Sequence, residues 1–183
     1  MEELKLYEGR PADCTGRLEK EIRTYDLLDK LGIQFWRTDH GWMKADTMED
    51  CHVIDACLNA TVCKNLFLCN RQKTNFYLLM MPGDKPFKTK VQTCALPILS
   101  FASPEDMEQY LDCTPGSSSI MGLANDAENK VQLLMDEDIK AGEYLGCHPC
   151  INTSSLKLRT ADVLETFLPA VHHEPIFVHL TGE

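Results

Sequence analysis

The sequence lacks any long apolar run, and aromatic residues make up only 8% of it. None of its apolar stretches approaches the ~20 residues that a membrane-spanning helix needs, so we expect no membrane partner. The N-terminus has neither the basic start nor the apolar stretch of a secretory signal. Hydrophobic residues nevertheless total 44% of the 183 residues, which is ordinary for a globular protein. A chain of this size can bury a core without disulfides.

Positive charge is also scarce, because 18 Lys and Arg residues face 28 Asp and Glu residues and give a net charge of −10. This balance disfavours a general nucleic-acid binder, since affinity for phosphates depends on basic side chains. A local basic patch remains compatible with it. Lys85, Lys88 and Lys90 form a candidate patch, although a solvated loop explains these lysines equally well.

The nine cysteines lack the even number and regular spacing of a disulfide framework. We therefore expect free thiols in a cytoplasmic protein. Cys147 and Cys150 form a Cys-x-x-Cys pair. A redox pair would stand at the start of a helix, and a zinc site would need a second pair, yet a strand-like segment follows and no second pair exists. Incidental thiols are the favoured interpretation, with redox and zinc chemistry as alternatives.

Apolar periodicity predicts both helices and strands. Helices are expected over residues 16–31 with Gly32 as the stop, over 48–58 with Thr47 as the cap, after Ser103 and Pro104, and from a Thr160 cap through Leu168. Strands are expected over residues 33–38, 66–68, 76–81, 131–135, 154–158 and 176–180, with the second and third forming a hairpin. The two types do not alternate strictly. The pattern favours a mixed α/β domain, with a partly barrel-like sheet packed by helices, over a doubly wound parallel sheet.

The chain divides into an irregular lead-in over residues 1–14 and one domain over residues 15–183. Inside the domain, the segment from Thr89 to Leu99 stands out because Pro97 interrupts a stretch with helical character.

Lys64 and Asn65 open an apolar strand, which is an unusual place for a lysine because burying an ammonium is unfavourable. One explanation is a side chain that extends from the strand end into solvent. The other is a pocket, where the ammonium could bind a phosphate, position a carbonyl or a water, or act as a base. Asn65 is expected to be a structural hydrogen-bonding residue.

Two further segments combine small and polar residues. Gly116 is followed by Ser117, Ser118 and Ser119, and such a loop can present backbone N–H groups to an oxyanion, although most such stretches are turns or caps. The second segment runs from Gly146 through His148-Pro149 to Asn152-Thr153. A neutral histidine there could orient water or accept a sugar hydroxyl, and an asparagine can bond back to the backbone. A structural turn is the alternative.

Together these three segments resemble the YbaK family of prolyl-tRNA-associated editing domains, over most of the chain. The resemblance implies a mixed α/β fold and hydrolysis of the ester of mischarged aminoacyl-tRNA, most of all alanyl-tRNA(Pro). It implies catalytic roles for Lys64, His148 and Asn152, and substrate contacts from Gly116, Ser117, Ser118, Ser119 and Gly146. It implies no cofactor and no metal. The implied partners are mischarged tRNA(Pro) and, further, prolyl-tRNA synthetase.

The chain departs from the family pattern at two places. Ile120 stands where the family loop has proline, and Ile98 precedes Leu99-Ser100-Phe101 where relatives carry arginine. These departures keep two other functions open: a cysteinyl-tRNA(Pro) deacylase and a non-catalytic tRNA-binding or regulatory protein of the same fold. The His172-His173-Glu174-Pro175 element also resembles the family, and we expect it to define the fold. The sequence has no Gly-x-Ser-x-Gly elbow and no metal motif, so it does not indicate a covalent intermediate or a metal-bound hydroxide.

Overall fold

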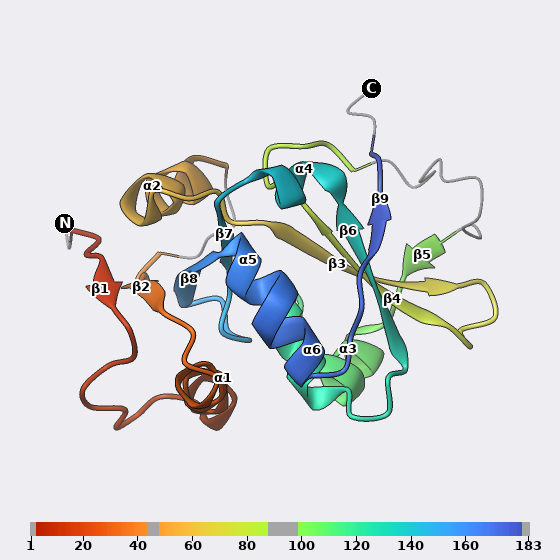
Figure 1. The fold of residues 1–183 in the computed structure, drawn as a ribbon, viewed down its shortest axis with the longest axis horizontal. Coiled ribbons are helices and arrows are strands. Elements are labelled where there is room, and N and C mark those ends of the chain that lie inside the picture. The colour runs from red at the N-terminus through yellow and green to blue at the C-terminus, as the bar shows by residue number, and fades with distance from the viewer. Residues whose placement is uncertain (1–2, 44–47, 88–98, 181–183) are drawn as a thin grey trace.

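Two β-sheets form the framework of the computed structural model, which describes residues 3–43, 48–87 and 99–180 (Figure 1). The first sheet is antiparallel, with strand order β1-β2-β8-β7. Its strands are β1 (Tyr7–Glu8), β2 (Phe35–Asp39), β7 (Tyr144–Cys147) and β8 (Ser154–Arg159). The second sheet has the order β5-β3-β4-β6-β9. Its strands are β3 (Lys64–Asn70), β4 (Phe76–Met81), β5 (Leu99–Phe101), β6 (Val131–Asp136) and β9 (Ile176–Val178).

The second sheet is mixed, as the sequence predicts. The strands β3 and β4 form an antiparallel hairpin with Lys64 opposite Met81. The strands β4, β6 and β9 are parallel neighbours. The mixed α/β fold is therefore confirmed.

Helices pack around and between the sheets. They are α1 (Glu19–Lys30), α2 (Met48–Leu58), α3 (Pro104–Leu111), α4 (Glu137–Ala141), α5 (Thr160–Asp162) and α6 (Leu168–Ala170), with a 3-10 helix η1 (Ile120–Asn125) and a π-helical turn η2 (Val163–Phe167). In Figure 1 the continuous rod of α5, η2 and α6 lies between the two sheets. Among the described residues no helix is long and apolar enough to cross a bilayer.

One buried cluster draws on both sheets and on the helices, which is why the described elements form a single domain. It includes Tyr25 of α1, Phe35 of β2, Phe67 of β3, Leu133 of β6 and Phe167 of η2. A smaller cluster covers the other face of the second sheet. Side chains alternate between the two faces of a strand, and this alternation sends Phe67 into the large cluster and Leu66 against the smaller one.

The sheets meet at a short backbone bridge. The Cys63 N–H donates to the Gly146 carbonyl at 2.9 Å, and the Gly146 N–H donates to the Thr61 carbonyl at 3.0 Å. A Cβ on Gly146 would lie 2.8 Å from the Cα of Val62, so only glycine allows this approach.

Of the residues predicted to begin or end a helix, two do so in the structure and one does not. Gly32 ends α1 in a left-handed conformation with φ of 67°, and its N–H and that of Ile33 bond to the carbonyls of Asp29 and Leu28, as in a Schellman motif. Ser103 caps α3 by accepting the Asp106 N–H at 3.1 Å. The Thr160 cap is wrong: Thr160 is itself helical after Arg159, and its buried hydroxyl has no partner among the described residues.

The lead-in over residues 1–14 is less irregular than expected. Tyr7 and Glu8 pair with Arg37 and Trp36, so β1 attaches this segment to the edge of the first sheet. The predicted cap Thr47, the lysines Lys88 and Lys90 and residues 89–98 lie outside the described residues.

Candidate active site

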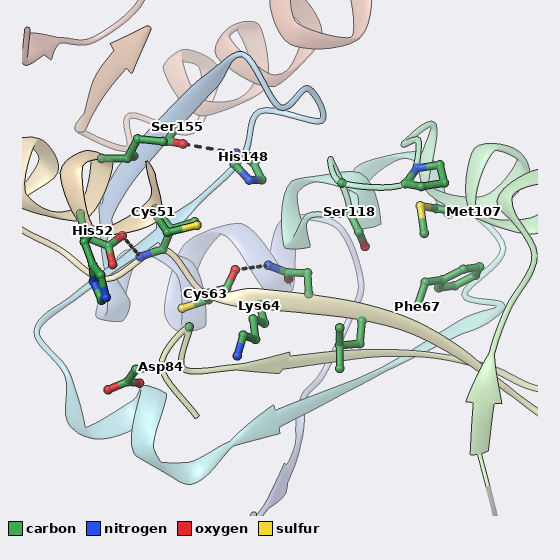
Figure 2. A pocket seen from close by; sticks show the side chains of 18 of the residues that line it. Cys51, His52, Cys63, Lys64, Phe67, Asp84, Met107, Ser118, His148 and Ser155 are labelled. Carbon is green, nitrogen blue, oxygen red and sulfur yellow. Dashed lines mark hydrogen bonds between the residues drawn. The ribbon is translucent and has the colours of Figure 1, made fainter. Parts of the chain in front are cut away.

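A cavity of about 410 Å³ surrounds the start of β3 (Figure 2). Its walls come from α2, the strand β3, the loop after β4, the loop 115–118 and the turn at His148. Within the described residues β5 pairs with residues 68–70 of β3, and the Ala102 N–H bonds to the Phe67 carbonyl, so the strand has a free edge over residues 64–66. The cavity extends around this edge, and its volume falls within the range usual for small-ligand sites.

Lys64 lines the cavity, and its ammonium is fixed by the loop that follows β4. Its Nζ donates to the Lys85 carbonyl at 2.9 Å. Lys85 in turn pairs its own Nζ with Asp136 at 2.7 Å and with Asp138 at 2.9 Å. Lys85 is therefore neutralised inside the protein and does not supply the basic patch that the sequence suggested.

His148 lines the cavity from the first sheet's side. Figure 2 shows its ring on one side of β3 and the Lys64 ammonium on the other, in agreement with the alternation that places Lys64 on the face of Leu66. The two side chains thus reach the cavity from opposite sides of the free strand edge.

Burial of the His148 ring, together with the neighbouring His40, lowers the pKa of His148 to about 4. The imidazole is therefore neutral at physiological pH. Its Nδ1 lies 3.0 Å from the Ser154 carbonyl and 3.3 Å from the Ser155 hydroxyl. Its Nε2 makes no hydrogen bond to the described residues.

The loop after α3 contributes Gly116 and Ser118 to the cavity wall. Gly116 adopts a φ of 88°, which favours glycine. The Ser118 hydroxyl is buried and has no partner among the described residues. Ser117 and Ser119 lie outside the lining. Ser117 is bonded to Thr114 at 3.0 Å.

Ser119 ties the loop to the histidine turn. Its hydroxyl donates to the His148 carbonyl and accepts the Met121 N–H at 3.1 Å, which caps η1. Ile120 follows and is fully buried in the core, so the residue that departs from the family's proline supports the loop from behind and does not line the cavity.

Two other residues singled out by the sequence stand behind the cavity wall. Gly146 lies in the bridge between the sheets. Asn152 is half-buried, and a Cβ on Gly116 would be 3.6 Å from its Nδ2. Asn152 therefore packs beside the Gly116 loop. The structure brings together Lys64, Gly116, Ser118 and His148, and places Gly146, Ser117, Ser119 and Asn152 around them.

Several cavity residues had no signal in the sequence. Asp55 accepts the Val62 N–H at 2.8 Å, and burial raises its pKa. Asp84 and Ser155 also line the wall. No spacing rule connects these residues, because they meet only through the tertiary fold.

The Cys63 and Cys147 thiols are unreactive because burial keeps them protonated. Burial raises the pKa of Cys63, which lines the cavity, to about 12, and it also raises the pKa of Cys147. A protonated thiol is a poor nucleophile. Cys147 and Cys150 are buried free thiols, and the described residues contain no group of three or more His, Cys, Asp or Glu side chains that could hold a metal.

A family model described as the aminoacyl-tRNA editing domain matches residues 43–166. This chain belongs to the aminoacyl-tRNA editing domain family. The family resemblance seen in the sequence is confirmed, and membership implies a mischarged tRNA as substrate.

Two relatives match most of this chain. The prolyl-tRNA editing protein ProX of Acetoanaerobium sticklandii is 28% identical over 138 residues, which are 74% of this chain and 83% of that protein. The prolyl-tRNA synthetase associated domain-containing protein 1 of Danio rerio is 26% identical over 165 residues, which are 88% of this chain and 86% of that protein.

Solved structures share the fold. A candidate trans-editing enzyme for prolyl-tRNA synthetase superposes with a TM-score of 0.63 at 11% identity, over 90% of this chain and 99% of the other. The hypothetical protein APE2540 gives 0.63 at 11% identity, over 86% of this chain and 98% of the other. At this identity the likeness concerns the fold of the editing domain alone.

Proposed function

We propose that this editing domain acts in trans as a deacylase that hydrolyses the ester of mischarged tRNA(Pro), with alanine as the amino acid removed. The observation that carries the proposal is a cavity that a lysine ammonium and a neutral histidine both line, on either side of a free strand edge. The name of the ProX relative supports the choice of tRNA.

Each cavity residue has a role that its geometry permits. The Lys64 ammonium has three N–H donors and gives one to the Lys85 carbonyl, which leaves two for the terminal phosphate or the ester carbonyl. The neutral His148 can accept a proton from water or from the ribose hydroxyl at Nε2. The backbone at Gly116 and the Ser118 hydroxyl can contact the aminoacyl group. Water is the nucleophile, since the Cys63 thiol is protonated.

The apolar part of the wall suits an apolar amino acid side chain. Phe67, Met107 and Pro115 line one side of β3, and Leu66 and Phe101 complete the wall. A pocket that admits alanine and excludes the proline ring would clear the error of a synthetase that accepts the smaller alanine.

The decisive experiment is single-turnover deacylation of tRNA(Pro) charged with alanine, cysteine or proline. We expect rapid loss of alanine and slow loss of proline. Faster loss of cysteine would assign the cysteinyl substrate, and binding without hydrolysis of any of the three would refute the deacylase. Repeating the assay with prolyl-tRNA synthetase tests whether that enzyme is the protein partner.

The Lys64→Ala variant tests the lysine. We expect it to fold normally and to lose at least roughly 100-fold in rate, the scale of one electrostatic or acid–base group in an active site. Lys130→Ala is the matched control, because Lys130 is exposed and pairs only with Glu128 among the described residues. Equal rates for the two folded variants would remove Lys64 from the mechanism.

A further inference from the structure

A serine hydroxyl at the cavity wall lies between two histidine rings. The Ser155 Oγ is 3.3 Å from the Nδ1 of His148 and 2.9 Å from the Nε2 of His40. Ser155 and His40 are both fully buried, and the ring centres of the two histidines are 6.3 Å apart. Figure 2 shows Ser155 bonded to the His148 ring at the upper edge of the cavity.

The contacts of His148 determine which ring nitrogen carries its proton. The Ser154 carbonyl, 3.0 Å from Nδ1, can only accept a hydrogen bond. The Nδ1 atom must therefore be the donor, and in a neutral ring Nε2 then has the free lone pair. The lowered pKa of His148 supports the neutral form.

The same reasoning extends to His40. Its Nδ1 faces the Met43 carbonyl at 3.4 Å, so this nitrogen is the donor and Nε2 is the acceptor. The Ser155 hydroxyl then donates to His40 and uses its oxygen to accept the proton of His148. In this series of hydrogen bonds, from His148 through Ser155 and His40 to Met43, every donor meets an acceptor. The reverse arrangement would place the lone pair of the His148 Nδ1 against the Ser154 carbonyl.

We propose that Ser155 and His40 are positioning residues that hold His148 in the Nδ1–H tautomer and present its Nε2 lone pair to the cavity. His40 does not line the cavity, and the Ser155 hydroxyl, which reaches the wall beside His148, is engaged by both histidine rings. The assignment of the tautomer concerns the free protein, whereas its effect on rate rests on the proposed deacylase function.

Long-range proton–nitrogen NMR of the histidine rings, recorded on the free protein, tests the tautomer. In the wild type we expect the His148 signals of a protonated Nδ1 and a bare Nε2. In Ser155→Ala the Ser154 carbonyl still favours a protonated Nδ1, but the second acceptor at 3.3 Å and the link to His40 are lost, and we expect the Nε2–H tautomer to become populated beside the other. Ser154→Ala is the matched control: its hydroxyl donates to the Thr38 carbonyl at 3.3 Å and its own carbonyl remains in place for His148.

A protonated Nε2 in the wild type, or an unchanged His148 tautomer in folded Ser155→Ala, would overturn the proposal. The wild-type spectrum decides even if the variant fails to fold. Deacylation of alanyl-tRNA(Pro) then measures the consequence: we expect kcat to fall roughly three- to tenfold in Ser155→Ala with little change in KM, the scale of one hydrogen bond. Absence of hydrolysis in the wild type would refute the deacylase and leave the NMR result standing.

Discussion

Single residues in this cavity owe their ionisation to burial. The pKa of His148 is lowered to about 4, and that of Cys63 is raised to about 12, so the cavity offers a neutral base and an inert thiol near neutral pH. The sequence identifies Lys64 and His148 as candidates, but it gives no indication of these pKa shifts, which depend on what the fold packs around each side chain.

The lowered pKa of His148 predicts how kcat/KM falls at acid pH. If neutral His148 is required, kcat/KM should hold down to about pH 5 and fall by half near pH 4, because protonation of the free enzyme's essential base removes activity. An ordinary histidine would give half-loss near pH 6.5. The measurement is kcat/KM on alanyl-tRNA(Pro), with circular dichroism at each pH to confirm folding. A midpoint near 6.5 in folded protein would contradict the role of His148.

The lowered pKa of His148 should also make the stability of the protein depend on pH, in a direction that can be stated. Because the folded pKa of His148 lies below its unfolded value, the unfolded chain takes up the proton first, and the free energy of unfolding decreases as pH falls from about 6.5 to about 4. The pKa of the buried His40 is lowered as well, so both histidines contribute in this direction.

At the scale of elements, periodicity identified the long segments and missed the short ones. Helices such as α1 and strands such as β6 bury one face or a continuous apolar run, and both patterns are readable. The missed elements β1, β5 and α4 have two to five residues, too few to show a period. The strand β7 contains Gly146, a poor strand former, whose place depends on Val62 far away in the sequence.

The loop after β4 is held by an ion pair that the sequence does not reveal. Lys85 pairs with the fully buried Asp136 at the end of β6, and its carbonyl holds Lys64. Lys85→Met should leave a buried carboxylate without its partner and lower the free energy of unfolding by about 3 kcal/mol. We also expect slower deacylation, since the backbone carbonyl that accepts from Lys64 is then no longer held in place by the ion pair.

Asp138→Asn is the control for this change. The Asp138 side chain pairs with the same ammonium but is 61% exposed, and exposed pairs contribute about 1 kcal/mol or less. Denaturant titration of the two variants gives the comparison. Similar losses in both would show that burial of Asp136 does not determine the energy.

At the scale of the whole molecule, the two sheets come close enough to share a cavity because Gly146 lets the backbones touch. Gly146→Ala should lower the free energy of unfolding by about 1–3 kcal/mol, the usual range for overpacking, since its Cβ would fall 2.8 Å from the Cα of Val62. The matched control is Gly142→Ala, whose Cβ would meet nothing nearer than 3.4 Å. Thermal melts of both variants measure the difference, and an undiminished Tm for Gly146→Ala would show that the junction can widen without loss.

The bridge at Val62 and Gly146 also provides a place where the contact between the two sheets can be measured. Each sheet forms one side of the cavity, with Ser155 on the first sheet and Phe67 on the second. The backbone hydrogen bonds of Cys63 and Gly146 lie where the two sheets meet. The amide protons of Cys63 and Gly146 take part in these bonds, so they exchange only when the contact between the sheets opens locally. The rate of hydrogen exchange at these two amides therefore measures how often the contact opens. An RNA end bound in the cavity should slow this exchange.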